Sequence, residues 1–126
     1  MMKVNSISGV LCYAGDLEST ATFYESLGFR IGKREPGRLS CYVNWFWVTF
    51  LAADQEDDAR LREEANSENR GVGLLLYIKV DDLDEYYQGV LANGMTPIGE
   101  PRKRAGNREF MLHDPDGYRL VFFEKK

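Results

Sequence analysis

Two segments of this chain repeat the same pattern with an offset of 66 residues, from Asp16 to Asp82 and from Gly28 to Gly94. Each segment opens with Asp-Leu, and each reaches its glycine twelve residues after the aspartate. An aspartate side chain accepts the free amide protons at a helix start, and glycine suits the left-handed residue just past a helix end. Apolar residues recur between them at spacings of three and four. The repeat therefore predicts two equivalent helices.

Strand-like stretches flank each predicted helix, one before it and three after it. Their β-branched and aromatic residues stand between turn residues, as strands require. The sequence Asp114-Pro115-Asp116-Gly117 predicts a tight turn between the last two strands, because proline pre-sets φ and glycine tolerates positive φ. The chain thus reads as βαβββ twice, an α+β fold. The predicted strands are 7–14, 29–35, 38–44 and 45–53, followed by 71–80, 95–100, 108–114 and 118–124.

Length and charge predict one domain of 126 residues, with module one at 4–53, an acidic linker at 54–70 and module two at 71–126. The linker holds seven acids and three bases, which accounts for the whole net charge of −4. We therefore expect a solvated linker and an electrically neutral remainder. Nucleic-acid binding is not expected, because the one basic cluster is short and lies in a loop marked by proline and glycine. Its members are Arg102, Lys103, Arg104 and Arg108.

The sequence also predicts a cytoplasmic protein. The N-terminal stretch lacks the pattern of a signal peptide, and no segment approaches the roughly 18 apolar residues that a membrane helix needs. Cys12 and Cys41 both lie in apolar, strand-like segments, so we interpret them as buried thiols rather than a disulfide. No membrane partner is expected.

The order of these motifs resembles that of the vicinal oxygen chelate superfamily. The pattern "DL…FY…LGF" follows the first strand, and "REF.L.DPDGY.L.F" closes the chain. That superfamily includes glyoxalase I, extradiol dioxygenases, fosfomycin-resistance enzymes and bleomycin-resistance proteins. The resemblance covers essentially the whole chain. It implies two βαβββ modules that form a cupped eight-stranded mixed sheet with the helices outside, often completed across a homodimer.

The metal-binding positions of such proteins carry no strong ligand here. The resemblance places these positions at Gly9, Thr49, Leu75 and Val121. A divalent cation needs several anionic or imidazole ligands converging at about 2–2.5 Å, and a threonine hydroxyl alone is a weak one. Shifting the strands by one or two residues brings in no acid or histidine on that face. We therefore expect no metal ion and no other cofactor.

Strand alternation predicts which side chains line the cup. They are mostly aromatic with a few polar groups, the mixture that small-molecule sites commonly use. Strand aromatics also serve as core or dimer packing, and that interpretation stays open for the tryptophans. Arg119 either holds an anionic or carbonyl group of a ligand or pairs with Glu109. The predicted ligand-binding residues are Tyr13, Tyr42, Trp45, Trp47, Thr49, Tyr77, Lys79, Arg119 and Phe123.

His113, the only histidine, enters the predicted turn and falls on none of the metal positions. Two structural interpretations are a hydrogen bond to Asp114 or Asp116 and a solvated surface position. A role in proton transfer is the alternative, because a histidine titrates near neutral pH.

These observations favour a metal-free protein that sequesters an aromatic or antibiotic-like ligand, similar to bleomycin-resistance proteins. The neutral cup argues against bleomycin itself, since a cationic drug favours acidic walls. The alternative is a lyase, isomerase or dioxygenase; without a metal, its acid or base would be Tyr13, Tyr77 or Lys79. A structural dimer without any ligand is a third possibility. The expected partners are a small molecule and a second copy of the chain.

Overall fold

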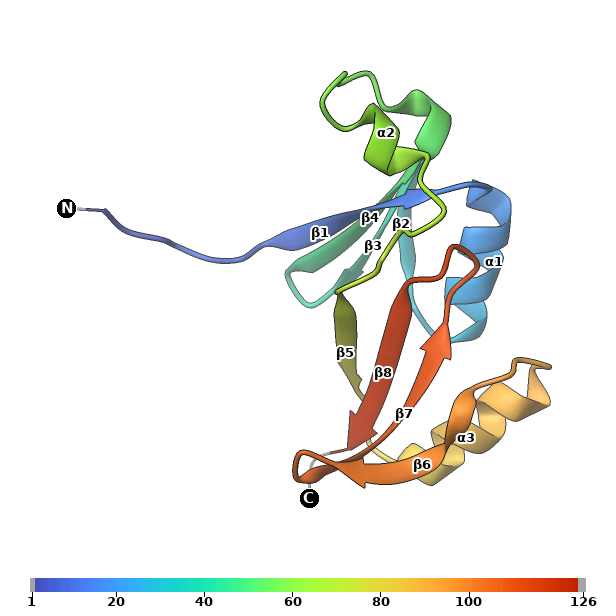
Figure 1. Cartoon of the computed structure of the whole chain (residues 1–126). Helices are drawn as coiled ribbons and strands as arrows, with labels where there is room; N and C mark the ends of the chain where they lie inside the picture. The colour runs from blue at the N-terminus through green and yellow to red at the C-terminus, as the bar shows by residue number, and fades with distance from the viewer. Residues whose placement is uncertain (1, 125–126) are drawn as a thin grey trace. The chain divides into compact units, whose positions relative to one another are not determined.

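The computed structural model describes residues 2–124, which fall into two compact units that meet in sequence between Glu68 and Asn69 (Figure 1). We refer to them as the N-terminal unit and the C-terminal unit. Each unit contains one four-stranded mixed sheet and one helix of ten residues. The α+β class and the twofold βαβββ order are confirmed.

The N-terminal unit has the strand order β1-β4-β3-β2, with β1 parallel to β4 and the other pairs antiparallel. A short segment with two helical turns follows its last strand. The elements are β1 (Gly9–Ala14), α1 (Leu17–Ser26), β2 (Ile31–Glu35), β3 (Arg38–Val43), β4 (Phe46–Ala52), η1 (Ala53–Gln55) and α2 (Arg62–Ala65).

The C-terminal unit repeats this topology with the order β5-β8-β7-β6, and β5 is parallel to β8. The elements are β5 (Leu75–Lys79), α3 (Leu83–Ala92), β6 (Ile98–Arg104), β7 (Asn107–His113) and β8 (Arg119–Glu124).

Both long helices begin and end as their sequences predict. The Asp16 carboxylate accepts the amide proton of Glu18 at 3.1 Å, and the Asp82 carboxylate accepts that of Glu85 at 3.0 Å. Just past the helix ends, Gly28 and Gly94 have φ values of 97° and 81°, where a Cβ atom would be strained.

One face of each sheet packs under the helix of its own unit. In the N-terminal unit the rings of Tyr24 and Phe50 lie 4.7 Å apart, and in the C-terminal unit Tyr86 and Phe122 have the same separation. Both phenylalanines are fully buried. The cysteines are buried on the corresponding face as predicted, and burial raises the pKa of the Cys41 thiol to about 11.

The structure corrects three expectations about where strands and loops lie. Trp45 belongs to the turn before β4, next to Asn44 with φ of 58°, rather than to the strand. The stretch with the basic cluster, expected to be a loop, is largely part of β6, so Arg102, Lys103 and Arg104 are held on a strand. The acidic linker is only partly solvated, because Ala65 of α2 is fully buried within it.

Within residues 2–124, no helix combines the length and the apolar character that crossing a membrane requires.

Candidate functional site

The face of each sheet that points away from its own helix is called the inner face here, and strand register defines it. In the N-terminal unit, Gly9 lies opposite Trp47, Leu11 opposite Thr49 and Tyr13 opposite Leu51. Across β4, Trp47 lies opposite Tyr42 and Thr49 opposite Ser40. The register predicted from alternation is therefore correct, and it places four of the predicted site residues on one face. These are Tyr13, Tyr42, Trp47 and Thr49.

Two aromatic rings of this inner face lie over glycines on the outer strands. A Cβ atom at Gly9 of β1 would overlap the indole of Trp47, so the indole occupies the space above that glycine. On the other edge, a Cβ atom at Gly32 of β2 would come within 3.1 Å of the Tyr42 ring. Aromatic rings commonly cover edge-strand glycines in this way. The two glycines leave room for the Trp47 and Tyr42 rings above β1 and β2.

A hollow of about 270 Å³ lies beside these rings. Trp47 and Tyr42 form its aromatic walls, and the hydroxyls of Ser40 and Thr49, 2.7 Å apart, form a polar pair between them. Its charged rim carries Arg38 and the Lys33–Glu35 ion pair, at 3.1 Å. Apolar walls with a few polar groups are typical of small-molecule sites.

The exposure of the three aromatic residues separates their roles. Tyr42 is 52% exposed and Trp47 is half-buried, so neither belongs to the core under the helix. Trp45 is 92% exposed at the tip of the β3–β4 turn and does not line the hollow.

Tyr13 is held by the segment that follows β4. Its hydroxyl donates a hydrogen bond of 2.6 Å to Oε1 of Glu56. Partial burial and this hydrogen bond raise the pKa of Tyr13 to about 12, and the same bond lowers the pKa of Glu56. The phenol therefore stays protonated at neutral pH and tethers the acidic segment to β1.

The inner face of the C-terminal unit carries a buried charged network beside its aromatic side chains. Glu109 of β7 has a side chain only 4% exposed, yet it is a carboxylate. Its Oε2 accepts a hydrogen bond of 3.1 Å from Nη1 of Arg104, and its Oε1 accepts one of 3.2 Å from the Tyr77 hydroxyl. Arg104 also donates to the Tyr77 hydroxyl at 3.2 Å. A buried carboxylate needs such partners, because an unpaired one is costly.

One of the two sequence interpretations expected Arg119 to pair with Glu109. The two residues do not pair. Glu109 lies opposite Phe123 in the register, whereas Arg119 lies opposite His113. The Glu109 carboxylate instead forms an ion pair with Arg104 of the neighbouring strand β6.

His113 is exposed at the end of β7. This agrees with the interpretation that it occupies a solvated surface position. The turn beside it is stabilised by Asp114, whose Oδ1 accepts the amide protons of Asp116 at 2.8 Å and Tyr118 at 2.9 Å. Gly117 has φ of 91°. The predicted hairpin is confirmed.

Two further predicted site residues, Lys79 and Phe123, lie on the inner face of the C-terminal unit. Lys79 lies opposite Phe123 at the end of β5 and is exposed. The centre of the Phe123 ring lies 5.8 Å from that of Tyr77, and the two ring planes are inclined at 60°.

The four metal positions named above do not fit a metal ion. The Trp47 indole fills the space above Gly9, and the Thr49 hydroxyl already bonds to Ser40. Leu75 and Val121 offer hydrocarbon only. Across residues 2–124, histidine, cysteine and acidic side chains do not gather in any group of three that could hold an ion.

Sequence reasoning missed the role of Glu109. Strand alternation in "REFMLH" places it on the same face as Met111, so an acid on the inner face was readable. Its partner Arg104 was not, because it was assigned to a loop. Gly32 lies at a local register shift in β2, and a glycine inside a predicted strand is a sequence signal for such a shift.

Comparisons with known proteins agree with this fold. Residues 6–122 match the profile of the Glyoxalase/Bleomycin resistance protein/Dioxygenase superfamily. No curated protein sequence matches the chain significantly.

Solved structures share the fold over nearly the whole chain. An integron cassette protein from V. cholerae has a TM-score of 0.80 at 20% identity, with 100% of this chain and 99% of that chain covered. A glyoxalase/bleomycin resistance protein/dioxygenase family enzyme from Burkholderia phytofirmans has 0.80 at 21%, covering 94% and 98%. A bleomycin resistance determinant encoded on transposon Tn5 has 0.64 at 27%, covering 97% and 99%.

Proposed function

Because this chain belongs to the Glyoxalase/Bleomycin resistance protein/Dioxygenase superfamily, we propose that it binds a small aromatic molecule on the inner face of its N-terminal unit, without a metal ion and without converting it. The observation that carries the proposal is the Trp47 indole lying over Gly9. It puts a flat aromatic surface where metal-dependent relatives are expected to hold a ligand atom.

The hollow beside the indole supports this function. A planar ligand can stack on Trp47 and Tyr42, which are only partly buried and therefore have surface to offer. Offset stacking on such rings contributes about 0.5–1.5 kcal/mol beyond the area buried. The Ser40–Thr49 hydroxyl pair can orient one polar group of the ligand.

The states of the possible acids and bases favour binding over catalysis. A tyrosine with a pKa of about 12, such as Tyr13, is a poor proton donor or acceptor near pH 7. The Tyr77 hydroxyl is already engaged by both Arg104 and Glu109. The lyase, isomerase or dioxygenase alternative therefore has less support than a binding protein.

We include two further elements in the proposal, a cytoplasmic location and a homodimer. Trp45 at 92% and Val43 at 50% exposure form an apolar tip on the β3–β4 hairpin, which suits contact with a second copy. Light scattering after size exclusion should give twice the chain mass, and Trp45→Ser should lower it toward that of one chain. A monomeric parent protein would remove the homodimer from the proposal.

Tryptophan fluorescence tests the binding function directly. The variant Trp45→Phe leaves Trp47 as the only reporter, and Trp47→Phe leaves only Trp45. Neutral aromatic compounds that do not absorb at the excitation wavelength, beginning with phenylacetamide and extending to larger bicyclic amides, are titrated into both. We expect saturable quenching or a shift of emission in Trp45→Phe and no response in Trp47→Phe.

Two outcomes would contradict the proposal. One is an unchanged Trp47 signal across the whole panel. The other is near-stoichiometric metal by mass spectrometry in protein soaked with manganese, nickel, iron or zinc, because that would require ligands on the inner face.

A further inference from the structure

The ladder between β6 and β7 is interrupted in its middle. Ile98 pairs with Met111 and Arg102 pairs with Glu109, so three residues of β6 stand opposite Phe110 alone. Gly99 adopts a φ of 78°, and Pro101 has no amide proton to give to the ladder. Bulges of this kind often lie beside functional sites, since they change the direction of side chains.

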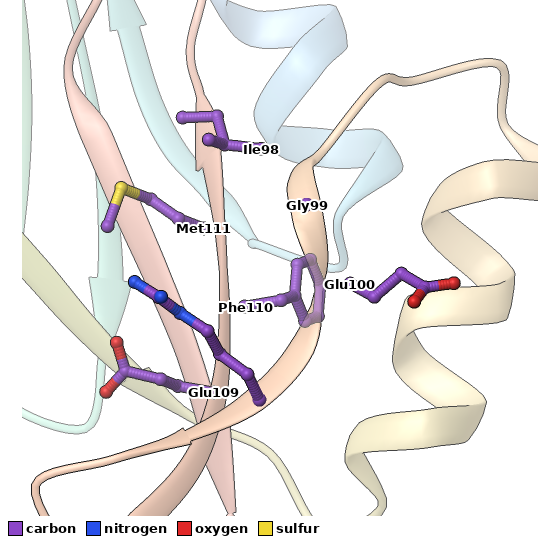
Figure 2. Close-up of a pocket in the computed structure, with 7 residues that line it drawn as sticks. Ile98, Gly99, Glu100, Glu109, Phe110 and Met111 are labelled. Atoms are coloured by element: carbon purple, nitrogen blue, oxygen red, sulfur yellow. The ribbon is translucent and has the colours of Figure 1, made fainter.

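A hollow of about 300 Å³ lies at this interruption. Its apolar walls include Ile98 and Met111, and its polar side includes Arg102 and Glu109. Figure 2 shows Met111 and Glu109 extending to one side of β7 and the Phe110 ring to the other. The space equals that of about ten water molecules in the liquid, enough for a one-ring compound with a short side chain.

Three charged residues line this hollow, the base Arg102 and the acids Glu100 and Glu109. The negative charge of Glu109 is neutralised by Arg104, and Figure 2 shows Glu100 directed away from Glu109 and Met111. The Arg102 side chain takes part in none of the ion pairs or hydrogen bonds found among residues 2–124.

Two more bases on the inner face, Lys79 and Arg119, have no ion pair within the described part of the chain either. Bases on one low-dielectric surface raise the local concentration of anions.

We propose that this hollow binds an acidic small molecule, a carboxylate attached to a short aromatic or alkyl body. The guanidinium of Arg102 holds the carboxylate through its planar fork of N–H groups, and Ile98 and Met111 contact the body. The proposal rests on the proposed small-molecule function but concerns a different hollow and a different chemical group, and its readout is separate.

The test compares phenylacetate with phenylacetamide, which has the same shape without the charge. The protein carries ¹³C-labelled methionine methyl groups, and the Met111 signal is assigned with Met111→Leu. We expect phenylacetate, but not phenylacetamide, to shift the Met111 methyl signal in a saturable way. The variant Arg102→Gln keeps a polar side chain and should weaken phenylacetate binding about tenfold or more.

The matched control is Lys103→Gln, which removes one positive charge from the adjacent residue of β6, whose side chain alternates to the other face. We expect it to change the affinity less than twofold. Equal affinity in Arg102→Gln and the parent protein, or an equal response of Met111 to acid and amide, would overturn the inference. A Trp47 response to phenylacetamide without any Met111 response to phenylacetate would overturn the inference and leave the proposed function standing.

Discussion

The two units have the same architecture but differ in their inner faces. Both have the same strand order and a tyrosine–phenylalanine pair between helix and sheet. The two tyrosines come from different helix positions, because the offset of 66 residues places Tyr24 at Val90 and Tyr86 at Thr20. On the inner face, however, the N-terminal unit carries Trp47 and Tyr42, where the C-terminal unit carries Arg119 and His113. The helix-facing side is constrained by packing, whereas the inner face is free to differ, and that difference is where we expect function to lie.

The two units also differ in where an acid and a base face each other across the edge strand and its neighbour. In the N-terminal unit Glu35 of β2 lies opposite Arg38 of β3, and in the C-terminal unit Arg102 of β6 lies opposite Glu109 of β7. The acid and the base have exchanged strands. As a result, the buried central strand holds a carboxylate in the C-terminal unit, and the edge strand offers the cation to solvent and to ligands.

The largest expected effect tests the shared architecture. Phe50→Ala and Phe122→Ala each remove a fully buried ring that contacts a tyrosine at 4.7 Å. We expect each substitution to lower the free energy of unfolding by about 3–5 kcal/mol, measured by urea titration with circular dichroism. A difference between the two above about 2 kcal/mol would show that the units are not equivalent in their cores.

The next effect tests the buried charge that only the C-terminal unit has. Arg104→Gln leaves Glu109 buried without a cation and should cost about 3 kcal/mol of stability. Glu109→Gln should cost less, about 1 kcal/mol, since the Arg104 side chain is 42% exposed and can turn to water.

The matched control in the N-terminal unit is Arg38→Gln, at the position equivalent to Glu109. Arg38 is exposed, so we expect a change within about 0.5 kcal/mol in the same urea titration. A cost of Arg104→Gln no larger than that of Arg38→Gln would mean that the Glu109 network is not buried.

A smaller effect tests the packing of Trp47 on Gly9, for which the C-terminal unit has Arg119 and Leu75 instead. Gly9→Ala forces the Trp47 indole off β1 and should cost about 2 kcal/mol while shifting the tryptophan emission to the red. Gly32→Ala needs the Tyr42 ring to move only slightly and should cost less than about 1 kcal/mol. Equal stability of Gly9→Ala and the parent protein would contradict the packing of Trp47 on Gly9.

The smallest effect concerns pH. The pKa of Tyr13 is about 12 in the folded chain against 10.0 ordinarily, so its contribution to stability is complete below pH 10 and disappears as the pH rises through about 12. The lowered pKa of Glu56 acts in the opposite direction, and its contribution is lost as the pH falls through that pKa.

Ultraviolet titration of phenolate measures this effect. We expect Glu56→Gln to lower the pKa of Tyr13, because it removes the carboxylate that accepts the proton. Tyr86, whose pKa burial alone raises to about 12, is the internal control and should not change. The Tyr13 assignment comes from the difference against Tyr13→Phe, and an unchanged Tyr13 titration in Glu56→Gln would contradict the hydrogen bond.

The sequence by itself determined the elements that local chemistry specifies. Asp16 and Asp82 cap the helices through bonds within three residues, and Gly28 and Gly94 end them through their own φ angles. Strand alternation also determined which residues share a face, because successive side chains point to opposite sides. The inner-face positions of Trp47 and Tyr77 therefore followed from parity alone.

Only the tertiary structure decided what those side chains contact. The indole rests on Gly9 because parallel pairing brings β1 beside β4, two strands separated by more than thirty residues of chain. Arg104 reaches Glu109 because β6 extends beyond the point where glycine and proline suggested a loop. Such contacts depend on pairing between distant strands, which carries no local sequence signal, and so the chemistry of both inner faces appeared only in the folded chain.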